Sequence, residues 1–111
     1  MGKVNLLVKY CLINTKDEYN INGILIDNTL KFLDKDSKMI LDFKTNTLKR
    51  ITEFLEIVFA FNEKICFIIV KENKRKFHFH FDLLELENKK NYFYVKYKIE
   101  SDNFEIEIFI N

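Results

Sequence analysis

The stretch FYVKYKIESDNFEIEIFI, residues 93–110, decides the fold. Before the polar segment ESDN, apolar side chains occupy every second position from Phe93 to Ile99, and after it they do so again from Phe104 to Ile110. A period of two places alternate side chains on opposite faces of a β-strand. Two such segments joined by a short polar turn predict an antiparallel hairpin.

The same alternation recurs along the rest of the chain. Polar segments such as NTKDEYN (14–20), KENKRK (71–76) and ENKKN (87–91) are typical of turns between strands. The further strands that we expect are residues 4–12, 19–26, 30–33, 39–44, 65–71 and 77–83. Short strands linked in this way predict an all-β fold, a single antiparallel meander of seven or eight strands closed or nearly closed into a small barrel. One domain spanning residues 1–111 is expected.

Residues 48–61, LKRITEFLEIVFAF, allow two interpretations. Leu48, Ile51, Leu55 and Val58 follow a helical spacing, which would make the fold α+β. Alternate positions from Leu55 to Phe61 share one strand face, and the β-branched and aromatic residues favour a strand. We prefer the strand, and Phe54 and Val58 then lie on the face opposite Phe59, so that both faces are apolar and need a cover.

Composition excludes several function classes. The formal net charge is +1 over 111 residues, which favours neither nucleic acid nor an anionic membrane as a partner. The longest apolar run, residues 65–70, is too short to span a bilayer as a helix, and the first residues lack a secretory pattern. Cys11 and Cys66 read as reduced, buried thiols, so we expect a cytoplasmic protein.

Two histidines one residue apart raise the question of a metal site. On a strand, His78 and His80 point the same way about 7 Å apart, with Phe77, Phe79 and Phe81 on the other face. Zinc sites need a third or fourth ligand, and the chain contains no further histidine. We interpret both imidazoles as solvent-facing, with metal binding as a weaker alternative.

Signals for catalysis are weak. Ser37 and Ser101 are the only serines and lie in polar turns, and Gly2 and Gly23 are the only glycines, too few for a phosphate-binding loop. The basic turn at residues 71–76 reads as a solvated hairpin turn. We therefore expect no enzyme activity and no cofactor.

The segments KVNLLVKY (3–10) and NGILIDNTLKFLD (22–34) look like early barrel strands. FHFHFDLLELE (77–87) looks like the strand pair before a final hairpin, and VKYKIESDNFEIEIFI (95–110) like that hairpin. In this order of features the chain resembles the small calycin-like (lipocalin-like) β-barrel proteins of unknown function from bacteria. The resemblance implies a barrel of a kind that often binds small apolar ligands inside.

These observations leave three functional hypotheses. The first is a non-catalytic barrel that binds a small apolar ligand in its lumen, lined by the inward-facing rings of Phe77, Phe79, Phe81, Phe93 and Phe104. The second is a protein-interaction module or homodimer that uses the 54–61 strand or an exposed strand edge. The third is a metal-binding protein that uses His78 and His80.

Overall fold

A computed structural model describes residues 2–12 and 15–111, which form strands and turns without a helix. Over this part of the chain there is accordingly no helix that could cross a membrane. The strands are β1 (Lys3–Leu12), β2 (Thr15–Ile26), β3 (Thr29–Asp34), β4 (Ser37–Asp42), β5 (Thr47–Ile51), β6 (Leu55–Ala60), β7 (Ile65–Val70), β8 (Lys76–His80), β9 (Asp82–Lys89), β10 (Tyr92–Ile99) and β11 (Asp102–Ile110).

All eleven strands belong to one antiparallel sheet, in the order β8-β7-β6-β5-β4-β3-β2-β1-β11-β10-β9. Neighbours in the sheet are neighbours in the chain, except that β1 pairs with β11. This pairing joins the N-terminal strand to the C-terminal hairpin and gives a nearly closed barrel. The expected all-β meander is confirmed.

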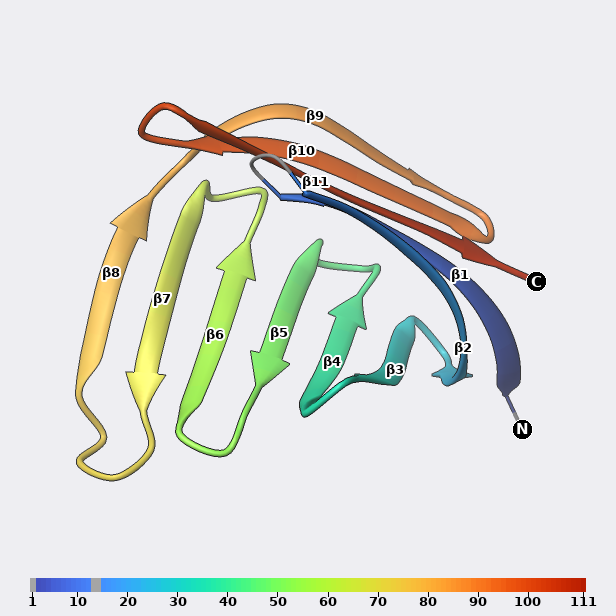
Figure 1. Cartoon of the computed structure of the whole chain (residues 1–111), viewed down its shortest axis with the longest axis horizontal. Coiled ribbons are helices and arrows are strands. Elements are labelled where there is room, and N and C mark those ends of the chain that lie inside the picture. Colours follow the sequence, from blue (N-terminus) through green and yellow to red (C-terminus); the bar gives the residue numbers. More distant parts are fainter. Residues whose placement is uncertain (1, 13–14) are drawn as a thin grey trace.

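Figure 1 shows two sets of strands that cross each other. Strands β3 to β8 run side by side in one set, and β1, β9, β10 and β11 cross over them in the other. The chain passes between the sets at two places, through β2 and through Phe81, the single residue between β8 and β9. These two corners position the features described below.

Alternation along each strand assigns one face to the interior. Leu6, Val8 and Tyr10 of β1 are buried, and their register partners in β11 are Ile110, Ile108 and Ile106. The interior is rich in packed aromatic rings. The rings of Phe59 and Phe61 stack with their centroids 5.6 Å apart, and Phe61, Phe81, Phe93 and Tyr97 complete the cluster.

Several expected boundaries were wrong. Residues 48–61 are not one element but parts of β5 and β6, separated by a turn at residues 52–54, and this split helps raise the strand number above the expected seven or eight. Residues 15–18, expected to be part of a turn before a strand at 19–26, belong to β2, because β1 and β2 stay paired as far as Leu12 and Thr15. Residue 14 lies outside the described residues. The polar composition of 15–18 reflects exposure and not a turn.

Candidate functional site

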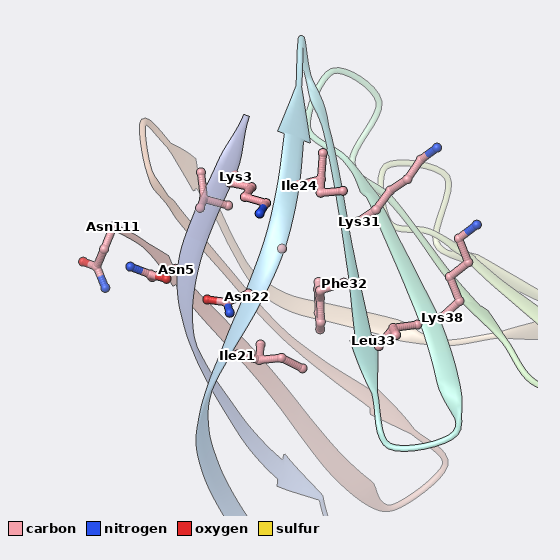
Figure 2. A pocket seen from close by; sticks show the side chains of 12 residues that line it. Lys3, Asn5, Ile21, Asn22, Ile24, Lys31, Phe32, Leu33, Lys38 and Asn111 are labelled. Carbon is pink, nitrogen blue, oxygen red and sulfur yellow. The ribbon is translucent and has the colours of Figure 1, made fainter. Parts of the chain in front are cut away.

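The wall of the barrel is incomplete between β2 and β3. Strand β2 pairs with β1 from Thr15 to Ile24 but with β3 only from Gly23 to Ile26. In the part of β2 before Gly23 the two backbones diverge, so Tyr19 and Ile21 have no backbone partner on β3. We call the resulting opening the β2–β3 slot. Figure 2 shows it in close view, with Ile21 and Phe32 lying where the β1–β2 pair separates from the β3–β4 pair.

A groove of about 980 Å³ occupies this opening and the surface beside it. Its volume lies at the upper end of the range of small-molecule sites. Ile24 and Leu33 are 46% and 63% exposed and provide apolar surface at the groove. The register places both on the outer face, because their inward-facing neighbours Gly23 and Phe32 are buried.

Gly23 allows neighbouring strands to approach β2 closely beside the groove. A Cβ atom at this position would lie 2.9 Å from Leu6 Cδ1 and 3.0 Å from the carbonyl oxygen of Lys31. A side chain here would therefore push β2 away from its neighbours. Glycine allows the close approach by which β2 pairs with both β1 and β3.

The groove is electropositive. Lys3, Lys31 and Lys38 line it, and its remaining polar side chains are asparagines, with no carboxylate side chain among the lining residues. In Figure 2 the side chains of Lys31 and Lys38 extend on the same side of β3 and β4. Three ammonium groups around exposed apolar surface suit an anion that carries an apolar body.

A polar cluster bridges the slot where the backbone does not. The Tyr19 hydroxyl donates a hydrogen bond to Asp34 Oδ1, which links β2 to β3. Arg50 Nη2 donates to Asp34 Oδ2 at 3.0 Å, and Arg50 Nη1 lies 3.5 Å from Ser37 Oγ. Asp34 is only 5% exposed, so its charge depends on the Arg50 guanidinium for compensation.

Tyr10 belongs to the same cluster but is not satisfied by it. Its ring lies 5.9 Å from that of Tyr19, centroid to centroid. Its hydroxyl is buried near Tyr19 and Asp34 but forms no hydrogen bond of normal geometry with the described residues. Burial, and then the negative charge of Asp34, raise the pKa of Tyr10 to about 12. Burial and the hydrogen bond to Asp34 also raise the pKa of Tyr19. Both groups are therefore neutral at physiological pH.

The five phenylalanines expected to line a lumen do not lie together in one cavity. Phe81 and Phe93 are buried in the aromatic cluster and Phe104 is partly buried beside it, with its ring stacked on Tyr97. Phe77 and Phe79 lie on the inward face of β8, as the alternation predicts, but they are 47% and 45% exposed. They lie opposite Ile68 and Cys66, but β8 is the edge of the sheet and has a neighbour on one side only.

His78 and His80 are exposed on the outer face of β8, as their alternation with phenylalanine predicts. The ring of His78 lies 5.7 Å from that of Phe67, and Lys76 Nζ lies 4.1 Å from the centroid of the same Phe67 ring. No group of three or more His, Cys, Asp or Glu side chains able to hold a metal ion occurs among the described residues. No third ligand for a site on these histidines is identified among residues 2–12 and 15–111.

The segment 54–61 is mostly β6, which lies between β5 and β7 in the sheet and has no free edge. Its outward-facing Val58 is buried between the register partners Lys49 and Phe67. Phe54, in the turn before β6, is exposed. The outward apolar face of β6, which we expected to need a separate cover, is therefore mostly covered by side chains of the neighbouring strands β5 and β7.

The two cysteines differ in their surroundings. Cys66 is buried, and burial raises the pKa of its thiol to about 11, so the expected unreactive thiol fits this residue. Cys11 is only partly buried, which is less than we expected. Both are free thiols.

Sequence reasoning missed the groove and the polar cluster. The signal for the cluster was available, since Asp34 follows Leu30 and Phe32 on the same strand face and so had to point inward. The signal for the groove was weaker. Gly23 is the only glycine inside a predicted strand, and glycine there often marks a sharp bend.

Comparison with known proteins adds no relative. No protein-family model matches the chain, no curated protein matches it, and no solved structure has a significant likeness to it.

Proposed function

We propose that this chain is a non-catalytic calycin-like barrel protein, related to the small bacterial proteins that it resembles, that binds a small amphipathic anion in the groove beside the β2–β3 slot. Buried aliphatic and aromatic side chains pack together in the interior, so we place the ligand site on the outer surface and not in the lumen. The observation that carries the proposal is the groove of about 980 Å³, with three lysines and no carboxylate side chain in its lining.

The chemistry of the groove specifies two parts of the ligand. Exposed Ile24 and Leu33 offer apolar contact to an alkyl or ring portion, whose burial contributes roughly 25 cal/mol per Å². The ammonium groups of Lys3, Lys31 and Lys38 and the amides of the neighbouring asparagines bind a carboxylate or a similar anion. These groups bind and orient an anion without requiring chemistry on it. The free thiols fit a cytoplasmic location for this activity.

Calorimetric titration with sodium octanoate tests the proposal. Octanoate carries both an anion and an apolar tail, whereas 1-octanol carries only the tail and acetate only the charge. We expect octanoate to bind and the two reference compounds to bind at least about tenfold more weakly, which corresponds to roughly 1.4 kcal/mol. The affinity for octanoate should fall as salt is added, because the lysines are exposed.

A pair of charge-reversed variants locates the site. Lys31→Glu with Lys38→Glu changes two groove residues and should weaken octanoate binding by about tenfold or more. Lys44→Glu with Lys90→Glu makes the same change of net charge at two exposed turn positions that are not among the groove residues. Equal binding of octanoate and 1-octanol, equal loss in both double variants, or no octanoate binding would each reject the proposal.

A further inference from the structure

Strand β8 lies at the edge of the sheet and pairs with another strand on one side only. β8 pairs with β7, and the chain then turns at Phe81 so that β9 pairs with β10 instead. Among the described residues no strand covers the other side of β8. A free strand edge presents a row of unpaired backbone N–H and C=O groups, which is a template for another strand.

The register identifies which backbone groups face this free side. Val70 N–H donates to the Arg75 carbonyl at 2.8 Å, so these two residues form a hydrogen-bonded pair. Such pairs alternate along an antiparallel ladder. The next hydrogen-bonded pairs are therefore Ile68 with Phe77 and Cys66 with Phe79. The backbone groups of Lys76, His78 and His80 then point away from β7, toward the open side.

The side chains of β8 divide in the same way. Phe77 and Phe79 lie on the face that carries Ile68 and Cys66, and both remain nearly half exposed. The outer face carries Lys76, His78 and His80. The edge thus combines free hydrogen-bonding groups with two apolar rings that lack a cover.

We propose that β8 pairs antiparallel with β8 of a second copy of this chain, about a two-fold axis at His78. The sequence KFHFH is suited to this pairing, because the register opposes His78 to His78, Lys76 to His80 and Phe77 to Phe79. The backbone groups that face outward, those of residues 76, 78 and 80, are the ones that this register joins. Phe77 and Phe79 become close non-hydrogen-bonded neighbours across the axis, where side-chain contact is strongest.

Charge favours a second copy as the occupant. In this arrangement the basic turn before β8 of one copy, which includes Lys74, meets the corner after β8 of the other copy, where Asp82 is exposed. Because the axis is two-fold, this attraction occurs twice and the assembly closes at a dimer. The proposal is independent of the anion groove, which lies at the β2–β3 corner, and it moves the homodimer contact from the internal strand β6 to the edge strand.

Measuring mass against concentration tests the pairing. We expect light scattering and sedimentation to show the 13.5 kDa monomer in dilute solution and twice that mass at roughly millimolar concentration, because an interface of one short strand pair is small. A single 13.5 kDa species throughout would overturn the proposal. Masses above the dimer would overturn it as well, since a two-fold pairing does not propagate.

Proline at position 78 gives a selective variant. The His78 N–H points to the open side, so His78→Pro removes a donor that the monomer does not use, while His78→Ala keeps it. We expect His78→Pro to abolish the dimer and His78→Ala to retain it. A dimer that persists in His78→Pro would refute the pairing.

A second pair of variants decides the question if His78→Pro fails to fold. Phe79→Lys places a charge in the proposed contact, whereas Ile26→Lys makes a similar change at an exposed position at the end of β2. We expect at least about a tenfold weaker dimer for Phe79→Lys and an unchanged one for Ile26→Lys. Equal effects of the two substitutions would count against β8 as the contact.

Discussion

Tyr10 and Tyr19 are chemically identical residues in opposite hydrogen-bonding situations. The Tyr19 hydroxyl donates to Asp34, whereas the Tyr10 hydroxyl is buried and forms no hydrogen bond of normal geometry within residues 2–12 and 15–111. A buried polar group without a partner costs about 1–3 kcal/mol, and a hydrogen bond to a charged group contributes about as much. Removing the two hydroxyls should therefore have opposite effects.

We predict that Tyr10→Phe leaves the free energy of unfolding unchanged or raises it by about 1 kcal/mol. Tyr19→Phe should lower it by roughly 1–2 kcal/mol, because Asp34 loses a donor and the side-chain bridge across the β2–β3 slot is weakened. Urea denaturation of the two variants beside the wild type measures both changes. A large loss of stability in Tyr10→Phe would show that its hydroxyl has a partner after all.

Alkaline pH should destabilise the fold through the same tyrosines. The pKa of Tyr10 is about 12 in the folded protein and about 10 in an unfolded chain. Between these values the unfolded state has lost the proton and the folded state retains it, so the free energy of unfolding falls as pH rises. For Tyr10 this fall in the free energy of unfolding amounts to about 2–3 kcal/mol by pH 12. It does not occur below pH 9.

Denaturation curves recorded from pH 8 to pH 12 test this dependence. Tyr10→Phe should show a shallower fall, because it removes one of the groups responsible. Other groups whose pKa values are raised by burial account for a remaining slope, namely Tyr19, Tyr92, Tyr94, Tyr97 and the thiol of Cys66. An identical slope in wild type and Tyr10→Phe would mean that Tyr10 titrates normally.

At the scale of single elements, the turns carry strain that glycine would relieve. Within the part of the chain that the structure describes, seven non-glycine residues have positive φ: Asp27, Lys35, Asn46, Lys64, Lys74, Asn91 and Glu100. This left-handed conformation costs an ordinary residue about 1 kcal/mol, and glycine adopts it freely. With only two glycines in the chain, most turns therefore store a small strain.

Lys64→Gly should stabilise the protein, because Lys64 has φ of 59° in the exposed turn between β6 and β7. We expect a gain of about 0.5–1 kcal/mol and a melting temperature higher by roughly 3–5 °C. Glu63→Gly, one residue earlier and not at positive φ, should destabilise by a similar amount, since it adds only freedom to the unfolded chain. Calorimetric melting of both variants compares them directly; two changes of the same sign would contradict the explanation.

Element type could be predicted from the sequence because alternation survives in most strands. FEIEIFI and KFHFH alternate along most of their length and lie in strands as expected, but the expected strand 77–83 is broken at Phe81, between β8 and β9. The first half of β2 could not be recognised, because both of its faces are mostly exposed and its composition resembles that of a turn. The division of 48–61 was hidden because both faces of β6 carry apolar residues, which obscures a period of two.

At the scale of the whole molecule, the barrel was predictable and its two corners were not. Alternation specifies which face of a strand points inward, but it does not say how far two strands remain paired. Pairing lengths follow from packing at particular points, such as the close approach that Gly23 permits. For this reason the alternation predicted the buried Phe93, but it did not predict that Phe77 and Phe79 are nearly half exposed at the edge of the sheet.

The open edge also determines where the molecule should be least protected. Strands β1, β10 and β11 are long, paired on both sides and rich in buried residues, so their amides should exchange most slowly with deuterium. β8 is short, exposed at every position and paired on one side. We expect its exchange to be the fastest of all strands in dilute solution.

Within β8, exchange should alternate from residue to residue. The amides of Phe77 and Phe79 are bonded to β7, and those of Lys76, His78 and His80 face the open side, so the first two should exchange more slowly. If two copies pair through this edge, raising the protein concentration should slow the second group and remove the alternation, and His78→Pro should restore it at Lys76 and His80. Uniform exchange along β8 in dilute solution would contradict the assigned hydrogen-bonding pattern, and alternation that persists at high concentration would contradict the dimer. Amide-resolved exchange followed by nuclear magnetic resonance therefore tests the monomer's edge and the proposed partner in one experiment.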